Sequence, residues 1–316
     1  MKTKFVYVVV SSLNDIFLEE AWVSIWSLKY YNPDAYVEVV ADKETVQTFD
    51  DASRKQFKDL VNNIISVDFE SNVSNLERSR WLKTRLRQIV SGDYLYLDSD
   101  TIITDSLTDI DHFDMDLGMV YDLHSHSSAR PEILKRWVKD IFDYRFKKED
   151  FSYFNSGVIY ARDIDEIYIF YERWHSNWLH SKKSGVFFDQ PSLNKVNDEM
   201  GGVITPISGE YNCQIAYTIK YLHKAKIIHF AMAPIFGISV YPISPFQQKS
   251  FYEGIKAKGS IDEDAQSIIL NSKSAFDVPT MPIGKEDFMF LSSRLIRHIR
   301  KIYNKHSWIF KFVEKL

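Results

Sequence analysis

The sequence predicts an α/β protein with a mostly parallel, mixed sheet flanked by helices. Three observations carry this prediction: a continuous apolar run at residues 5–10, strand and helix patterns that alternate as far as residue 67, and an apolar run at 94–97 that ends in Asp98-Ser99-Asp100. Continuous apolar strands are typical of parallel sheets covered on both faces. Alternating strands and helices indicate right-handed parallel crossovers.

Composition bounds the class of protein. With 316 residues, 45% hydrophobic and 15% aromatic, the chain can bury one large core or two modest ones, which excludes a disordered or fibrous protein. Its one cysteine, Cys213, excludes an internal disulfide framework and suits a reducing compartment. The apolar run at 5–10 is too short for a secretory signal. The stretch 227–246 lacks charged residues but contains three prolines, so we expect core strand and loop there rather than a membrane span.

Hydrophobic periodicity and turn residues divide the chain into elements. Apolar and aromatic runs bounded by polar residues predict strands at 5–10, 36–41, 64–67, 94–97, 117–122, 153–161 and 225–230. Apolar residues at helical spacing predict helices at 19–31 (stopped by Asn32-Pro33), 43–60, 78–87, 131–142, 164–179 and one opened by 186–191 that runs through 196. Residues 107–113 form a short connection. These boundaries place several polar side chains at strand ends.

Asp98 and Asp100 follow the central apolar strand, with one residue between them. In an open α/β sheet, ligands bind at the carboxyl ends of strands, so both acids are placed to work at one site. Two carboxylates this close are tolerated best with a cation between them, which predicts a divalent metal. The pattern resembles the DxD motif of GT-A glycosyltransferases and also the first motif of haloacid-dehalogenase-type phosphatases. A surface turn with two solvated acids is the simplest alternative.

The predicted helix at 78–87 is dense in basic residues just before this acidic site. A diphosphate needs cations beyond its metal, so we expect at least one of Arg80 and Lys83 to lie at the site. Arg85 and Arg87 are expected on a solvated face. No glycine-rich phosphate loop of the Walker or Rossmann kind occurs in the sequence. Metal and side chains must therefore hold any phosphates.

Six short motifs in a fixed order resemble the family 8 glycosyltransferases, which include glycogenin and bacterial lipopolysaccharide galactosyltransferases. The motifs are Leu95-Tyr96-Leu97-Asp98-Ser99-Asp100, Leu117-Gly118 with Asp122, Phe154-Asn155-Ser156-Gly157-Val158, Asp189-Gln190 with Leu193-Asn194, Tyr211-Asn212 and Ile228-His229-Phe230. The resemblance covers about three quarters of the chain. It implies a GT-A fold, a nucleotide sugar donor, a Mn²⁺ or Mg²⁺ cofactor and retention of anomeric configuration.

The resemblance assigns roles by position. The implied metal ligands are Asp98, Asp100 and His229. The implied donor contacts are Ser11, Arg80, Lys83, Asp122, Asn155 and Ser156, and the implied catalytic pair beneath the anomeric carbon is Asp189 and Gln190. Purely structural roles compete with three of these assignments: His229 as a core residue, Asn155 as a cap at a strand start, and Asp189 as a helix N-cap before Pro191.

Retention requires a covalent intermediate on a carboxylate or front-face attack within an ion pair. We expect front-face attack, with Gln190 stabilising the oxocarbenium-like state and the leaving phosphate helping to deprotonate the acceptor. Two departures from the family pattern concern the nucleotide. Met232 and Ile235 stand where a glycine and a diphosphate-binding lysine are common, and the loop at 11–14 lacks an acid. UDP is the expected nucleotide.

Two other functions stay open. A phosphatase using Asp98 and Asp100 would need paired acids after a late strand, and the late acidic cluster Asp262-Glu263-Asp264 is predicted to lie in a polar loop without such a strand. A diverged, non-catalytic carbohydrate-binding protein would need no metal. The favoured interpretation is transfer of a hexose to a glycan or lipid-linked acceptor in surface polysaccharide assembly.

The C-terminal residues differ from the rest of the chain. Seven Lys or Arg and one acid fall in residues 294–316, although the whole chain carries a net charge of −4. Apolar residues at 295, 296, 299, 302 and 303 share one helical face, a pattern typical of a helix at an anionic membrane surface. Docking on the chain's own domain or on a dimer partner is the alternative, and no nucleic-acid motif accompanies the tail. We predict a catalytic domain at 1–285 and a basic amphipathic tail at 286–316, in a cytoplasmic protein peripheral to the inner face of the cell membrane.

Overall fold

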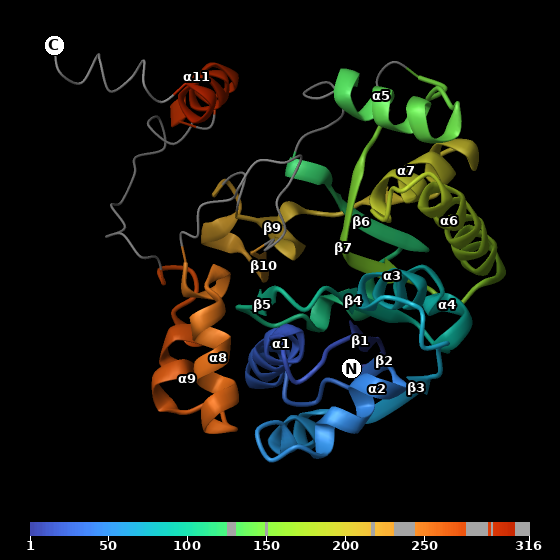
Figure 1. Ribbon diagram of the computed structural model, residues 1–316. Coiled ribbons are helices and arrows are strands. Elements are labelled where there is room, and N and C mark those ends of the chain that lie inside the picture. The colour runs from blue at the N-terminus through green and yellow to red at the C-terminus, as the bar shows by residue number, and fades with distance from the viewer. Residues whose placement is uncertain are drawn as a thin grey trace, which may run out of the picture.

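A seven-stranded mixed sheet forms the centre of the molecule, in the order β3-β2-β1-β4-β7-β6-β8 (Figure 1). The computed structural model describes residues 1–124, 131–148, 151–215, 219–230, 244–275, 290–291 and 293–306. A second sheet of three strands has the order β5-β10-β9. The strands are β1 Lys4–Val9, β2 Val37–Asp42, β3 Asn63–Val67, β4 Tyr94–Leu97, β5 Thr101–Ile103, β6 Leu117–Tyr121, β7 Phe154–Ala161, β8 Thr205–Pro206, β9 Cys213–Gln214 and β10 Ile227–His229.

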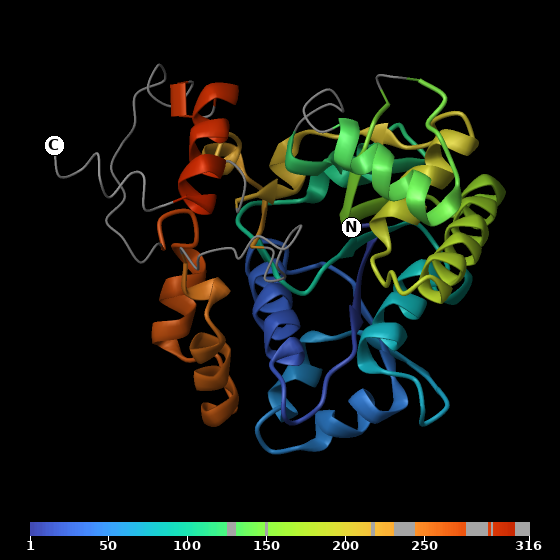
Figure 2. The same ribbon diagram turned by 45° about the horizontal axis from the view of Figure 1, so that its top comes forward.

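Helices cover both faces of the large sheet (Figures 1 and 2). They are α1 Phe17–Tyr31, α2 Lys43–Gln47, α3 Asn75–Thr84, α4 Leu86–Ile89, α5 Pro131–Phe142, α6 Asp165–Lys183, α7 Gln190–Glu199, α8 Lys249–Lys258, α9 Glu263–Leu270 and α11 Arg294–Lys305. β1, β2, β3 and β4 run parallel, whereas β7 is antiparallel to both β4 and β6. The predicted class, an α/β fold with a mostly parallel mixed sheet, is confirmed.

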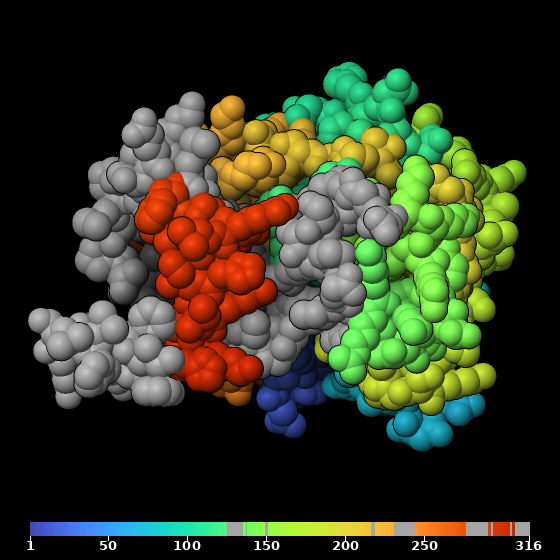
Figure 3. Space-filling model, turned by 90° about the horizontal axis from the view of Figure 1, so that it is seen from above, coloured from blue at the N-terminus to red at the C-terminus, as the bar shows by residue number. Residues whose placement is uncertain are grey.

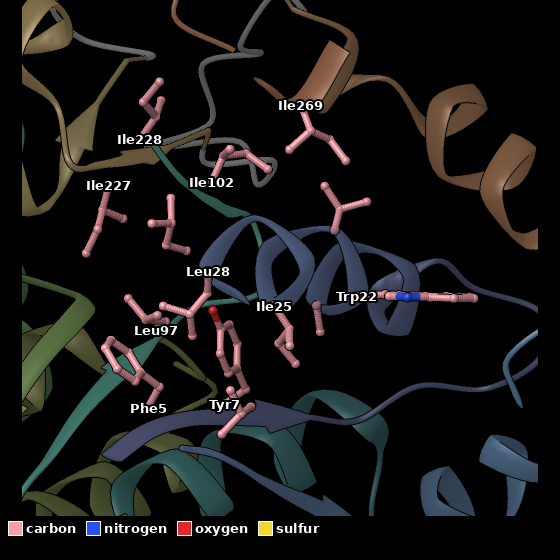
Figure 4. Close-up of a cluster of buried hydrophobic side chains, with 14 of the residues drawn as sticks. Phe5, Tyr7, Trp22, Ile25, Leu28, Leu97, Ile102, Ile227, Ile228 and Ile269 are labelled. Carbon is pink, nitrogen blue, oxygen red and sulfur yellow. The ribbon is translucent and has the colours of Figure 1, made fainter. Parts of the chain in front are cut away.

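β1 separates two cores, because successive side chains of a strand point to opposite faces. Phe5, Tyr7 and Val9 pack with α1 and β5, and Val6 and Val8 pack with α3, α6 and α7 on the other face. Figure 4 shows α1 lying between β1 and the small sheet, with Trp22, Ile25 and Leu28 among the buried side chains that fill this layer. α1 thereby connects the two sheets.

Two predictions about helices were wrong. Residues 43–60 do not form one helix: α2 is followed by the 3-10 turns η1 Thr48–Asp50 and η2 Lys55–Leu60. Between these turns, Asp51 accepts hydrogen bonds from the backbone N–H and hydroxyl of Ser53, which competes with helix formation. Arg87 is fully buried rather than solvated, because its guanidinium donates to the carbonyls of Val90 and Gly92 and stacks over Tyr94. Arg85 is partly buried, with its guanidinium over the ring of Trp81.

The predicted C-terminal helix is present as α11, at the surface of the molecule (Figure 3). Its side chains Leu295, Ile299, Ile302 and Tyr303 are exposed, so the described part of the tail does not bury this apolar face against its own domain. The predicted boundary at residue 285 falls between the described segments and stays a prediction. Among the described helices, none combines the length and apolar character needed to cross a bilayer.

A buried ion pair ties α1 to the irregular segment after α2. Arg54 and Glu19 are both inaccessible to solvent, and the guanidinium donates to the two carboxylate oxygens at 2.7 and 2.9 Å. The same guanidinium also donates to the hydroxyls of Thr48 and Ser11. This arginine therefore holds the loop between β1 and α1 as well as the helix.

Arg54→Met is expected to lower the free energy of unfolding by about 3–5 kcal/mol, because it leaves the Glu19 carboxylate buried without its partner. Urea unfolding measures the change. Lys58→Met is the control, since it breaks the solvent-exposed pair with Asp50 and should change stability by less than about 1 kcal/mol. Equal effects of the two substitutions would contradict this account.

Candidate functional site

Strand pairing between β5 and β10 brings three predicted metal ligands together. β5 begins directly after Asp98-Ser99-Asp100. In the antiparallel pairing of β5 with β10, His229 lies opposite Thr101. One ligand atom each from Asp98, Asp100 and His229 lies within 4.8 Å of the others. The imidazole Nε2 of His229 is 3.2 Å from Oδ1 of Asp100. The apolar run of the sequence is thus divided between two sheets, with the acids at the junction.

The chemistry of this group fits a divalent cation. Carboxylates with one imidazole suit Mn²⁺, and the remaining positions of such a site take oxygen ligands. Burial disfavours a charged imidazole, but the carboxylate of Asp100 outweighs it and raises the pKa of His229. A bound cation would take the place of the proton that Asp100 favours on this ring and would balance the charge of the two acids.

Lys83 connects the cluster to neighbouring elements. Its side chain is 2% exposed, and its ammonium group donates to Oδ1 of Asp98 at 3.0 Å and to the hydroxyl of Ser156 at 3.3 Å. It also lies 3.5 Å from Oδ2 of Asp189. α3 therefore supplies a cation that contacts residues of three other segments, and a diphosphate contact by Lys83 or Arg80 stays a prediction.

Both carboxylate oxygens of Asp189 have polar or charged partners. Nε of Arg80 is 3.2 Å from Oδ1, and the hydroxyl of Ser156 donates to Oδ2 at 2.8 Å. Burial raises the pKa of Asp189, but Lys83 and Arg80 outweigh it, and the net shift is downward. Asp189 occupies the N-cap position of α7, yet its side chain makes no capping hydrogen bond. The side chain of Asp189 therefore contacts the residues of the cluster and does not cap the helix.

Gln190 lies beside the start of β7. The backbone N–H of Ser156 donates to its Oε1 at 3.4 Å. The side chain of Asn194 bonds the N–H and C=O of Phe154 and the carbonyl of Gln190, which joins the first turn of α7 to β7. The predicted catalytic pair and the predicted donor contacts at 155 and 156 therefore form one rigid corner.

Asp122 and Asn155 also meet at this corner. The amide nitrogen of Asn155 donates to Oδ1 of Asp122 at 3.1 Å, and Oδ1 of Asn155 accepts from the N–H of Gly157 at 2.9 Å. A Cβ on Gly157 would lie 2.3 Å from Cε1 of His229, so only glycine allows the ring this approach. Asn155 makes the predicted cap at the strand start and still faces the cluster.

Ser11 has a different environment. Its hydroxyl is bonded to the Asp15 carboxylate, the Arg54 guanidinium and the N–H of Leu18, which fixes the loop between β1 and α1. A donor contact by Ser11 stays a prediction, as does every other role assigned by resemblance. Met232 and Ile235, which depart from the family pattern, lie outside the described residues.

Three residues near the cluster had no predicted role. The hydroxyl of Tyr96 donates to Asp98, and Asn212 bonds both His229 and Asn155. Glu20 of α1 is 4% exposed and accepts a long hydrogen bond of 3.5 Å from Ser99. Burial and, next, the charge of Asp100 raise the pKa of Glu20 to about 8. Helical periodicity gave no signal for Glu20, because only the contact between α1 and the β4–β5 junction gives it this position.

Comparison with known proteins supports the fold. Neither the protein-family models nor the curated protein sequences compared with the chain gave a match. Among solved structures, the galactosyltransferase LgtC in complex with donor and acceptor sugar analogs superposes with a TM-score of 0.52 at 16% identity, over 84% of this chain and 99% of that one. An active-site mutant of LgtC gives 0.54 at 16% identity over the same shares. Mouse xyloside xylosyltransferase 1 gives 0.49 at 12% identity, over 74% and 100%. The chain therefore shares a GT-A fold with the two LgtC structures.

Glu20→Gln is expected to remove a pH-dependent loss of stability in metal-free protein. With a pKa of about 8 against an ordinary 4.5, folded Glu20 keeps a proton that the unfolded chain releases. The contribution of Glu20 to the free energy of unfolding is complete below pH 4.5. It is lost as the pH rises toward 8, by an amount on the order of 4 kcal/mol. Urea unfolding with chelator, from about pH 5 to 9, should give a flatter profile for the variant. Parallel profiles would contradict the assigned pKa.

Proposed function

We propose that this protein is a metal-dependent, retaining glycosyltransferase that moves a hexose from a nucleotide sugar to a glycan or lipid-linked acceptor. The observation that carries the proposal is the convergence of Asp98, Asp100 and His229 within 4.8 Å, beside the buried ammonium group of Lys83. A cation and a lysine side by side match the needs of a leaving diphosphate. The GT-A fold supports the same class of reaction.

Each part of the cluster has a proposed task. Asp98, Asp100 and His229 hold Mn²⁺ or Mg²⁺, which when bound acts as a Lewis acid toward the leaving nucleoside diphosphate. Lys83 and Arg80 supply further positive charge on the side of α3. Asp122, Asn155 and Ser156 bind hydroxyl groups of the donor sugar, since carboxylate, amide and hydroxyl groups offer both donors and acceptors.

The environment of Asp189 supports front-face attack over a covalent intermediate. Arg80 approaches one of its oxygens at 3.2 Å, and Ser156 and Lys83 approach the other at 2.8 and 3.5 Å. Such contacts stabilise the carboxylate and lower its nucleophilicity. We therefore assign Asp189 to orienting Lys83, Arg80 and Ser156, and Gln190 to stabilising the oxocarbenium-like state. The leaving phosphate takes the acceptor's proton.

UDP is the proposed nucleotide, and surface polysaccharide assembly is the proposed setting. LgtC, which shares the fold, was solved with donor and acceptor sugar analogs, and this supports a glycan acceptor. The acidic cluster at 262–264 does not follow a strand, as the phosphatase alternative would require. Asp262 is the N-cap of α9 and accepts from the N–H of Ala265, while Glu263 and Asp264 form the first helical turn. The predicted polar loop at these positions was wrong, because the acids stabilise a helix N-terminus.

A panel of nucleotide sugars tests the proposal. Purified protein with Mn²⁺ should bind and slowly hydrolyse one donor, and chelator should abolish turnover. Asp100→Asn should lower turnover at least about 100-fold, since it removes a charged ligand of the cation. Asp105→Asn, a matched change at an exposed acid five residues away, should leave turnover within about twofold.

Three results would overturn the assignment. Hydrolysis of a phosphate ester, lost in Asp100→Asn, by a protein that binds no nucleotide sugar with any metal would establish the phosphatase alternative. Sugar binding that is the same with Mn²⁺ and with chelator would indicate a non-catalytic carbohydrate-binding protein. Equal losses in Asp100→Asn and Asp105→Asn would remove the acid pair from the mechanism.

We also propose that α11 places the protein on an anionic membrane surface, as a peripheral protein of the inner face of the cell membrane. Leu295 is 62% and Ile302 is 48% exposed, and Arg297, Arg300 and Lys301 are exposed on the same helix. An exposed apolar face bordered by cations is the arrangement that binds a lipid interface. A lipid-linked acceptor would be reached at that surface.

Vesicle sedimentation tests this placement. Replacing Arg297, Arg300 and Lys301 with Gln should weaken binding to vesicles of anionic lipid about 100-fold, since each cation contributes about 1 kcal/mol. Gln at Lys2, Lys55 and Lys224, three exposed lysines elsewhere, is the control. Equal binding to neutral and anionic vesicles, or equal losses in the two triple variants, would contradict the proposal. Self-association of the chain without lipid would favour a dimer partner.

A further inference from the structure

A continuous hydrogen-bond chain runs from the backbone of β7 to the ring of His229. The N–H of Gly157 donates to Oδ1 of Asn155 at 2.9 Å. The same oxygen accepts from Nδ2 of Asn212 at 2.9 Å, and Oδ1 of Asn212 lies 3.0 Å from Nδ1 of His229. Asn212 therefore stands between a fixed backbone donor and a candidate metal ligand.

The direction of each bond in this chain follows from its two ends. A backbone N–H can only donate, so the group of Asn155 that faces Gly157 must be its oxygen. A carboxylate accepts, so the other group of Asn155, which faces Asp122 at 3.1 Å, must be its nitrogen. Both ends give the same orientation for Asn155. Its oxygen then requires the nitrogen of Asn212, and the oxygen of Asn212 is left for His229.

The ring of His229 consequently has a hydrogen on Nδ1. We propose that Asn212 is a positioning residue that holds His229 in the Nδ1–H tautomer and leaves the Nε2 lone pair for the divalent cation. This inference rests on the proposed function, which identifies the ligand of Nε2 as a divalent cation. Nε2 is the nitrogen that faces Asp100, at 3.2 Å. Without a cation, Nε2 can donate a hydrogen to this carboxylate, and a bound cation would take the place of that hydrogen. A metal-ligating histidine is commonly oriented in this way by the partner of its other nitrogen.

Packing keeps the ring in this orientation. His229 is 6% exposed, and its ring lies against the Cα of Gly157, where an added Cβ would be 2.3 Å from Cε1 and 2.8 Å from Nδ1. The backbone of His229 pairs with Thr101 on one side and Gln214 on the other. Since Asn212 directly precedes β9, the strand pairing that places His229 also places its hydrogen-bond acceptor.

Nitrogen NMR of histidine-labelled, metal-free protein tests the tautomer in the Asp100→Ala background, which removes the carboxylate that competes for a hydrogen on Nε2. The His229 signal is identified among the nine histidines by its absence when His229→Gln is added. At a pH where that signal reports a neutral ring, the Asp100→Ala protein should carry hydrogen on Nδ1. Hydrogen on Nε2 in this background would overturn the inference, whatever the activity of the protein.

Two variants separate orientation from simple structural support. Asn212→Leu removes the acceptor: together with Asp100→Ala it should shift the tautomer toward Nε2–H, and alone it should weaken Mn²⁺ binding, measured by calorimetry, about 10- to 100-fold. Asn212→Asp keeps an acceptor toward Nδ1, so in the Asp100→Ala background it should retain the Nδ1–H tautomer even where urea unfolding shows lost stability. Equal Nδ1–H populations in both variants would overturn the role of Asn212. If the Asp100→Ala protein shows Nδ1–H but wild type binds no Mn²⁺, the proposed function fails while the tautomer assignment stands.

Discussion

The candidate site depends on the contacts of the buried ammonium group of Lys83. It lies within 3.5 Å of Asp98 and Asp189 and donates to Ser156, which belong to the β4–β5 junction, the N-cap of α7 and β7. Without a cation at this point, the buried carboxylate of Asp189 and the partly buried carboxylate of Asp98 would both have less compensation for their charge. α3 therefore supplies the charge that allows β4, β7 and α7 to present acids at one corner.

The second constraint is the division of the chain between two sheets. β4 belongs to the large sheet and β5 to the small one, so the acids at 98 and 100 stand where the backbone changes from one sheet to the other. The small sheet then delivers His229 through β10 and Asn212 through the start of β9. α1 packs between the two sheets (Figure 4). It also carries Glu20, which accepts a hydrogen bond from Ser99 at the same junction.

The local predictions succeeded where a single physical rule decided the outcome. Continuous apolar runs predicted β1 and β4, and the helix at 131–142 was predicted with the bounds that α5 has. The predictions failed where particular side-chain contacts overrode the local pattern. Arg87 carries the same charge as Arg85, which is only partly buried, but carbonyls at 90 and 92 and the ring of Tyr94 enclose Arg87. Residues 43–60 have helical spacing, but Asp51 bonds Ser53 and Arg54 is drawn to Glu19.

The sequence by itself determined the mixed α/β class, the position of the acids at the end of a strand, and the basic helix that precedes them. These properties depend on periodicity and on residue types that are close in the chain. The tertiary structure alone decided that Lys83 bridges Asp98 and Asp189, that Asn212 lies between Asn155 and His229, and that Glu20 is buried near Asp100. Each of these contacts joins residues 15 to 106 positions apart, and one hydrogen bond or charge pair leaves no periodic pattern in the sequence.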